Sequence, residues 1–483
     1  MSKEAADSKY FGASTPEIVG ASMIQISNNL FNVLMNFATY LATGGWGIGV
    51  MVAGYIVSSM RMWDGITDPI VAWFVPKVRS RFGVATPMIF LGWLFELVSI
   101  AGMFILFPKT QSAVLFFVLY FFYVIGYTMV NKAFALMKIL ITNDPKKRPL
   151  IARTTQISVR VVTMFMSLYR AKILFPKYGG LTLGLFQELA YFILIVTTVL
   201  MIVGLFCCRK YDDADEFERR YHGATNFTLK DIWNLMAHNS AFLTFVISTA
   251  TDKIASASAS AAAVSTMLFG IVIGNYSFSG DMSVYTTIVA FILIWTATGR
   301  ARKKGSRDAY LKMCYLSILV AAVTCVFLCV IDPTTISKSF IPTAIFVVLY
   351  SMMSSFASTT NACVKSMEID IADYDYYLHD KFLGPLCASV ANLLTKLVDS
   401  ASSIIISAAL TMLGYVGTMP QQGDPCTPKL FWTTMALWLG MPVAGYIASI
   451  IAMHWYPLSG EKMEEVQATI KAKRDAAAAQ SAK

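Results

Sequence analysis

The stretch Arg61-Met62-Trp63-Asp64-Gly65-Ile66-Thr67-Asp68-Pro69 places three charged side chains within residues 46–75, a segment that is otherwise free of charge. On an α-helix Asp64 and Asp68 are one turn apart and Arg61 lies three residues before Asp64, so all three share one face. A charge at the centre of a bilayer costs about 2.5–3.5 kcal/mol, and residues that bear it face a polar interior and mark transport paths. The segment is therefore predicted to be a membrane-spanning helix with a functional charged face.

Two carboxylates one turn apart suit a small cation. When ionised, each offers only oxygen acceptors, and each can instead carry a proton, so the pair is expected to bind Na⁺, Li⁺ or H⁺. The alternative is a structural ion-pair network, in which Arg61 neutralises one aspartate and fixes helix packing. We favour the cation site because ionisable residues inside membrane spans are usually functional.

Composition excludes a soluble globular protein. The chain has 483 residues, of which 56% are hydrophobic and 14% charged, and its mean hydropathy is +0.59. A spanning helix needs about 20 residues, and the sequence offers twelve apolar stretches of this kind between short polar breaks. The expected fold class is an all-α integral membrane protein with twelve transmembrane helices. They are placed near residues 18–42, 46–75, 87–107, 112–141, 151–174, 182–208, 239–273, 281–299, 309–331, 337–371, 382–415 and 431–455.

The net charge of +10 does not indicate nucleic acid, because the basic residues sit in short breaks between the spans. They concentrate in alternate breaks, at 77–81, 146–148, 209–220 and 300–307. By the positive-inside rule the side with the basic breaks is cytoplasmic, so both termini are expected in the cytoplasm. The expected location is the inner or plasma membrane.

The chain divides into two similar halves. Residues 209–238 carry mixed charges and are predicted to be a cytoplasmic linker between six-helix bundles at 1–208 and 239–457, with a cytoplasmic tail at 458–483. The basic breaks at 77–81 and 300–307 each follow the second span of a half, which indicates an internal duplication. Two parallel six-span halves with a substrate site between them near mid-depth are typical of the major facilitator fold.

Three segments then carry a resemblance to a known family. Residues 61–69 are similar to the motif R-x-W-D-x-x-[NT]-D-P, residues 370–374 to D-x-x-D-Y, and Lys396 falls in the eleventh span, where the family carries a lysine. The chain resembles the glycoside-pentoside-hexuronide:cation symporters, the melibiose-permease-like branch of the major facilitator superfamily. The resemblance runs over essentially the whole chain.

The resemblance implies roles for individual residues. Asp64 and Asp68 would be the cation carboxylates, Na⁺ ligands if the coupling is to sodium, and Thr67 and Thr128 would add neutral oxygens. Lys396 would keep the carboxylates ionised or compete with the coupling ion. Its alternative is a salt bridge with Asp399 or with an aspartate of the second span. The remaining roles are Arg61 as a second charge partner, and Asp370, Asp373 and Tyr374 at the cytoplasmic gate.

The solute positions depart from the family pattern. The family's sugar-specific members hold the sugar with an aspartate in the first span, another in the fourth, and an aromatic one turn later. Here these positions are Asn28, Asn131 and Ala135, which argues against a galactoside-like solute. The expected solute contacts are Asn28, Asn131, Lys132, Asn361, Lys365 and Asn392.

The two lysines among these contacts would favour an anion. A carboxylate or sulfonate would pair with Lys132 or Lys365. Alternatively, Lys365 pairs with Glu368 or Asp370 on its own helix, and Lys132 faces the lipid headgroups.

The predicted function is a secondary symporter. It would take up a glycoside, hexuronide or related sugar acid with Na⁺ or H⁺ by alternating access, without a cofactor and as a monomer in the lipid bilayer. An uncoupled facilitator or exporter of small organic anions is the alternative. An enzyme is disfavoured because no HExxH, GxSxG or phosphate loop occurs, and a transport-dead sensor would need a signalling domain.

Overall fold

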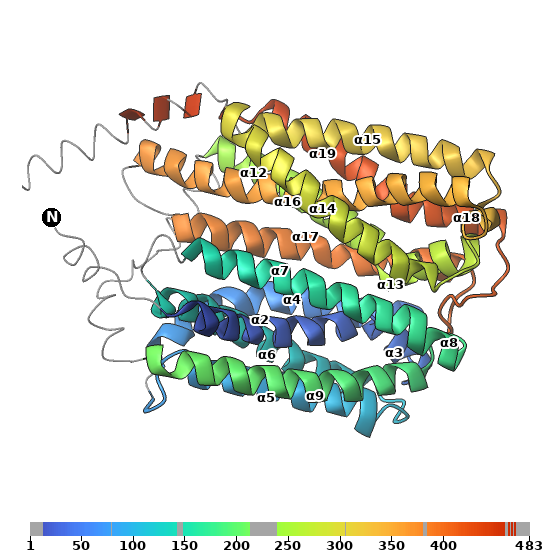
Figure 1. Cartoon of the computed structure of the whole chain (residues 1–483), viewed down its shortest axis with the longest axis horizontal. Coiled ribbons are helices and arrows are strands. Elements are labelled where there is room, and N and C mark those ends of the chain that lie inside the picture. Colours follow the sequence, from blue (N-terminus) through green and yellow to red (C-terminus); the bar gives the residue numbers. More distant parts are fainter. Residues whose placement is uncertain are drawn as a thin grey trace, which may run out of the picture. The chain divides into compact units, whose positions relative to one another are not determined.

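The computed structural model describes residues 13–78, 80–142, 148–212, 239–304, 306–379 and 384–458, with three residue pairs between 462 and 469. These residues are almost entirely helical (Figure 1), and the one β-bridge among them joins Ser80 to Gly83. The predicted all-α class is therefore confirmed. The predicted linker lies mostly outside the described residues, as does most of the predicted tail.

Every apolar stretch singled out in the sequence carries helix. The elements from the N-terminus to Tyr211 are α2 (Thr15–Met35), α3 (Ala38–Gly44), α4 (Val50–Phe74), η1 (Val75–Lys77), α5 (Thr86–Ala101), η2 (Gly102–Leu106), α6 (Ala113–Ile141), α7 (Arg148–Leu168), η3 (Tyr169–Leu174), α8 (Phe175–Tyr178), α9 (Leu183–Cys208) and η4 (Arg209–Tyr211). Those after the central segment are α12 (Ser240–Ser260), α13 (Ala262–Ser265), η5 (Thr266–Val272), α14 (Phe278–Lys304), α15 (Ser306–Val330), η6 (Pro333–Thr335), α16 (Phe340–His379), α17 (Gly384–Met412), α18 (Pro428–Met435), η7 (Ala436–Gly440) and α19 (Met441–His454).

Many of these helices can cross a membrane. Within the described ranges, eight are long and apolar enough, and α12 with its continuation through Val272, bent by 47° at Ala261, would be a ninth. The chain is thus an integral, multi-pass membrane protein. Helix α4, with its three charges, is not among the eight. The number of twelve crossings stays a prediction.

The chain forms two compact units, each of which is described by itself. The first comprises Met1–Thr225, Tyr276–Gly280 and Ile406–Asp424, and the second comprises Asn226–Asn275, Asp281–Ile405 and Pro425–Lys483. Hydrogen bonds tie Ile406–Asp424, a segment from late in the chain, to the rest of the first unit. The N–H of Val50 donates to the carbonyl of Val416 (2.9 Å), and the N–H of Leu181 donates to Oε1 of Gln421 (3.0 Å).

A buried aspartate caps one helix of the first unit. Asp212 follows α9, and its carboxylate accepts from the backbone N–H groups of Val84, Ala85 and Thr86 at the start of α5, at 2.6–3.2 Å. These are donors that a helix N-terminus otherwise leaves without a partner, and a negative charge is stabilising there. The close approach needs Gly83, which has φ +103° and whose added Cβ would lie 2.4 Å from Asp212 O.

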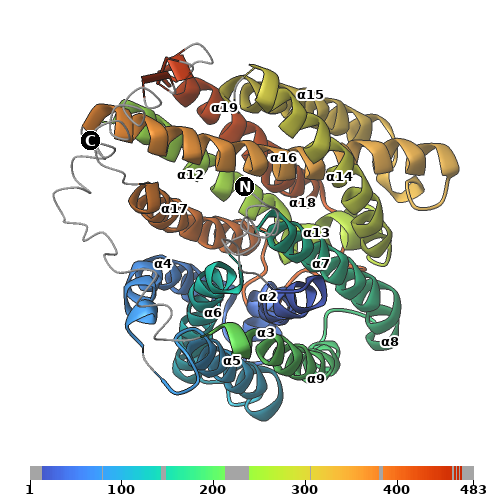
Figure 2. The same ribbon diagram turned by 60° about the vertical axis from the view of Figure 1, so that its left-hand side comes forward.

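Two glycines allow α5 and α6 of the first unit to pack side by side (Figures 1 and 2). A Cβ on Gly126 of α6 would lie 2.5 Å from the carbonyl oxygen of Gly92 on α5, and a Cβ on Gly92 would lie 2.8 Å from that of Gly126. Small residues at such positions let membrane helices approach closely. Helix α6 also carries Thr128 and Lys132.

Substituting Gly126 is expected to weaken the first unit. Gly126→Val forces two backbones apart, and overpacking of this kind costs typically about 1–3 kcal/mol of unfolding free energy. Thermal unfolding of the purified protein should show a lowered midpoint. Gly44→Ala is the matched control, since an added Cβ there meets nothing within 4 Å. An unchanged midpoint for Gly126→Val would show that the two helices are not held at this distance.

Candidate functional site

Three of the predicted cation-site residues lie together where α4 packs on α6. Thr128 on α6 is buried, and its Oγ1 donates to Oδ1 of Asp64 on α4 at 3.0 Å. Oγ1 of Thr67 lies 3.4 Å from Oγ1 of Thr128, and it donates to the backbone carbonyl of Trp63 at 2.9 Å. Because the hydroxyl proton of Thr67 is donated to its own helix, only the lone pairs of Oγ1 face the neighbouring side chains. The arrangement gathers one carboxylate and two hydroxyls.

Lys132 is the residue that completes this cluster. Its Nζ lies 3.1 Å from Oδ1 of Asp68, and the two side chains are 29% and 14% exposed. Thr128 and Lys132 are one turn apart on α6, as Asp64 and Asp68 are on α4, so the two faces match residue for residue. The sequence predicted Lys132 as a ligand of an anionic solute or as a headgroup contact, whereas the structure pairs it with a cation-site carboxylate. We call Asp64, Thr67, Asp68, Thr128 and Lys132 the carboxylate cluster.

The formal charges around the carboxylate cluster cancel. Asp64 and Asp68 contribute −2, and Lys132 with the half-buried Arg61, three residues before Asp64, contributes +2. A site of two carboxylates alone would draw in a small cation strongly in a medium of low dielectric constant. Here Lys132 and Arg61 balance the negative charge of the two carboxylates, which weakens the attraction for an added cation. Among the described residues there is also no group of three or more His, Cys, Asp or Glu side chains suited to a metal ion.

Of the two asparagines at the family's sugar positions, the amide of Asn131 forms hydrogen bonds inside the first unit, whereas that of Asn28 forms none with the described residues. Asn131 accepts from Nε2 of Gln25 on α2 at 3.1 Å and donates to the carbonyl of Tyr127 at 2.9 Å. Asn32 on α2 donates to the hydroxyl of Tyr127 at 3.2 Å. Asn28 is fully buried, and neither atom of its amide has a hydrogen-bond partner in the described part of the chain. The sequence signals missed Gln25, Asn32 and Tyr127, although a polar stripe at 25, 28, 29 and 32 on one helix indicates such an interior face.

The remaining predicted residues belong to the second unit. Lys396 is half-buried on α17, with Asn392 exposed one turn before it. Its predicted role beside the aspartates stays a prediction. Helix α16 carries the others: Asp370 and Asp373 are half-buried there, and Tyr374 packs against a buried apolar cluster. Lys365 is on the same helix, but its side chain lies outside what the structure describes.

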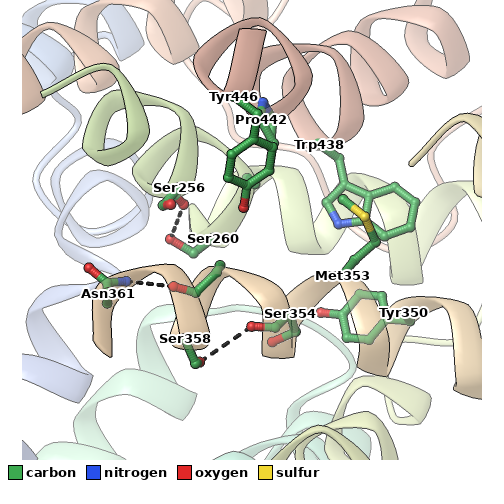
Figure 3. Close-up of a pocket in the computed structure, with 12 residues that line it drawn as sticks. Ser256, Ser260, Tyr350, Met353, Ser354, Ser358, Asn361, Trp438, Pro442 and Tyr446 are labelled. Carbon is green, nitrogen blue, oxygen red and sulfur yellow. Dashed lines mark hydrogen bonds between the residues drawn. The ribbon is translucent and has the colours of Figure 1, made fainter. Parts of the chain in front are cut away.

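The second unit contains a cavity that the sequence did not predict as a site. It has a volume of about 270 Å³ and lies between the end of α12, the middle of α16, and η7 with α19 (Figure 3). Asn361 is the one predicted solute contact in its lining, which otherwise consists of small, hydroxyl-bearing, aromatic, methionine and proline side chains. Small residues occupy positions 255–263, from the end of α12 into α13. Ala255 packs closely against α19, since a Cβ on Gly445 would lie 2.7 Å from the Cβ of Ala255. Ser256 and Ser260 line the cavity instead.

Comparison with known proteins places the chain among transporters. The family model described as MFS/sugar transport protein matches residues 17–460. A protein of Escherichia coli (strain K12), YagG, named as a candidate glycoside/cation symporter, is 26% identical over 121 residues. That match covers 25% of this chain, and the chain spans 26% of the length of this curated relative.

Solved structures are similar in fold. A structure from work on substrate recognition in proton-dependent oligopeptide transporters has a TM-score of 0.59 at 13% identity, covering 94% of this chain and 100% of that one. A mutant of the nucleoside transporter NupG has a TM-score of 0.61 at 12% identity, covering 92% and 99%. A bacterial homologue of the iron transporter ferroportin, facing outward, has a TM-score of 0.56 at 11% identity, covering 91% and 98%.

These identities support the fold alone. The family model, in contrast, covers nearly the whole chain. An all-helical, multi-pass membrane protein that matches it from residue 17 to residue 460 is a transporter and not an enzyme. The chain belongs to the MFS/sugar transport protein family.

Proposed function

We propose that the protein is a secondary symporter that takes up a small solute of the glycoside type together with a monovalent cation by alternating access. Membership of a sugar-transport family supports the solute class, and the name of the Escherichia coli relative supports both the glycoside and the cation. We place the protein in the inner or plasma membrane with both termini in the cytoplasm. No cofactor beyond the coupling ion is needed, and the monomer is the proposed functional unit.

The carboxylate cluster is the observation that carries this proposal. It sets two carboxylates and two hydroxyls between two packed helices, in a chain that crosses a membrane. Ionisable groups at such a place are costly and are characteristic of ion pathways. A cation that binds there reduces the negative charge that holds the ammonium of Lys132 near Asp68. Cation binding can therefore be linked to the position of the Lys132 side chain.

The cluster favours H⁺ over Na⁺. A sodium ion needs several oxygens at once, yet one carboxylate already holds an ammonium at 3.1 Å and the other accepts from a hydroxyl at 3.0 Å. A proton needs a single carboxyl oxygen. Protonation of Asp68 would remove the negative charge that holds Lys132 and release its ammonium. We therefore propose that the coupling ion is H⁺.

The charge balance of the cluster also supports a second candidate function. With four charges that cancel, the site needs no added cation to be electrostatically stable, and this favours an uncoupled facilitator. Solute would then equilibrate across the membrane but would not accumulate.

Transport by the purified protein in liposomes separates these candidates. The probes are radiolabelled methyl glucoside, methyl galactoside, glucuronate and galacturonate, which we call the sugar panel. We expect at least one member to accumulate when a pH gradient, acidic outside, is imposed, and a Na⁺ gradient at equal pH on both sides to have little effect. Accumulation driven by Na⁺ alone would overturn the choice of ion, and equilibration without accumulation under either gradient would establish the facilitator.

A further inference from the structure

We propose that the cavity of the second unit is a binding subsite for the uncharged, hydroxyl-rich ring of a glycoside. This inference rests on the proposed function and names the chemistry of the solute. Figure 3 shows the cavity with serines and Asn361 along its polar side and Trp438, Tyr350 and Tyr446 along its aromatic side. None of the lining residues that the structure describes is charged.

The aromatic side is a rigid wall. The rings of Tyr350 and Trp438 stack with centroids 5.7 Å apart and planes 26° apart. Tyr350 is backed by Phe269 at 5.3 Å and by Phe346 at 5.7 Å, so its ring is held from behind. Aromatic faces carry partial negative charge, which suits the C–H groups on the apolar face of a sugar ring. The wall supplies a stacking surface of fixed orientation.

The polar side presents hydrogen-bond acceptors. Oγ of Ser260 donates to the carbonyl of Ser256 at 2.7 Å, and Nδ2 of Asn361 donates to that of Ala357 at 2.7 Å. The side-chain oxygens of both residues remain able to accept, and the amide of Asn361 keeps a second N–H that can donate. Sugar hydroxyls can donate to such oxygens, whereas an ionised carboxylate can only accept. The described lining gives an ionised carboxylate no positive charge to pair with, so it matches a polyol better than an acid.

A helix break lies beside the serines that line the cavity. Helix α12 ends at Ser260, Ala261 is extended (φ −61°, ψ 141°), and the chain resumes as α13 with a bend of 47°. The last carbonyls of a helix have no partner within it and form the negative end of its dipole. That end disfavours a carboxylate and favours hydroxyl donors. Broken helices of this kind build the substrate sites of many secondary transporters.

A second irregular segment lies across the cavity. Trp438 is in η7, a π-helical segment between α18 and α19, and π-bulges inside helices occur frequently at functional sites. The cavity is therefore bounded by two departures from regular helix, the break after Ser260 and the π-helical segment that carries Trp438. Its volume of about 270 Å³ is near the lower end of ligand pockets, roughly 300–1,000 Å³, which suits one sugar ring.

Binding to the purified full-length protein tests this subsite without any ion gradient. We would titrate the four unlabelled members of the sugar panel by calorimetry into the native protein and into Trp438→Leu. We expect the methyl glycosides to bind more tightly than the uronates, and Trp438→Leu to weaken the methyl glycosides at least about fivefold, the effect of losing one aromatic contact. Trp432→Leu is the matched control, because Trp432 is on α18 but 57% exposed and outside the cavity lining.

A second variant guards against a folding defect. Asn361→Leu leaves the aromatic wall intact at an exposed position of α16, and it should weaken the methyl glycosides by a similar factor. Tighter binding of the uronates, undiminished binding in both variants, or no binding of any panel member at millimolar concentration would each overturn the subsite. Failure of ion coupling in the liposome assay would leave these binding results unchanged, so the two proposals fail separately.

Discussion

Asp64→Asn and Asp68→Asn are each expected to abolish accumulation of solute, so that the ratio of inside to outside concentration falls to one. Asparagine has nearly the shape of aspartate, and at position 64 its amide oxygen can still accept from the hydroxyl of Thr128. It can neither carry a negative charge nor take up a proton under these conditions. The solute site is proposed elsewhere, in the second unit, so binding of the sugar panel should persist.

The two variants should differ in stability. Asp68→Asn leaves the ammonium of Lys132, which is only 29% exposed, without its carboxylate, and an unpaired buried charge is destabilising. At position 64, asparagine can keep the hydrogen bond from the neutral hydroxyl of Thr128, so the thermal unfolding midpoint of Asp64→Asn should be the higher of the two. Asp332→Asn is the control, because Asp332 caps η6 between spans and asparagine caps equally well. Full accumulation by both cluster variants would place the coupling site elsewhere.

Lys132→Met is expected to create sodium binding. Methionine keeps the apolar stem of lysine but removes the ammonium, so Asp68 loses its positive partner and the net charge of the cluster with Arg61 becomes −1. A small cation then neutralises that charge and stabilises the folded protein in proportion to its affinity. Addition of Na⁺ should raise the thermal unfolding midpoint of Lys132→Met by several degrees at constant ionic strength, and it should leave that of the native protein unchanged.

A lysine on the same helix provides the control for this experiment. Lys138 lies over the ring of Phe134, with Nζ 4.7 Å from its centroid, and does not belong to the carboxylate cluster. Lys138→Met should therefore behave like the native protein in Na⁺ and in K⁺. If Lys132→Met shows no response to Na⁺, or if the native protein responds equally, the ammonium of Lys132 is not what keeps Na⁺ from Asp68.

The sequence predicted the helices and one face of the cation site. Hydropathy is a local property, so each apolar stretch became a helix or a run of helices at nearly the expected place. The spacing of Asp64, Thr67 and Asp68 is likewise local, since it depends only on the geometry of one helix.

The ion pair between Lys132 and Asp68 could not be predicted from one helix, because it depends on how α4 and α6 pack together, and no local pattern in the sequence gives that packing. The matching spacings of 64 with 68 and 128 with 132 are a signal that could have indicated it. An ammonium four residues after a predicted cation ligand is a candidate for the same site.

The cavity was not predictable from local patterns. Its lining comes from three stretches, near residues 256–260, 350–361 and 438–446, that are far apart in the chain. The break at Ala261 contains neither proline nor glycine, the residues that most often interrupt a helix. The cap that Asp212 forms on α5 was hidden for a similar reason, because an aspartate in a charged segment gives no indication of its partner.

The pH outside proteoliposomes, followed as solute is added, tests proton-coupled uptake most directly. No gradient is imposed, and the solute is the member of the sugar panel that binds most tightly. We predict that the external medium becomes more alkaline with native protein, because each solute molecule that enters brings a proton with it, and that it does not change with Asp64→Asn or Asp68→Asn. Entry of labelled solute without any change in pH, or entry that requires Na⁺, would contradict proton coupling at these two aspartates.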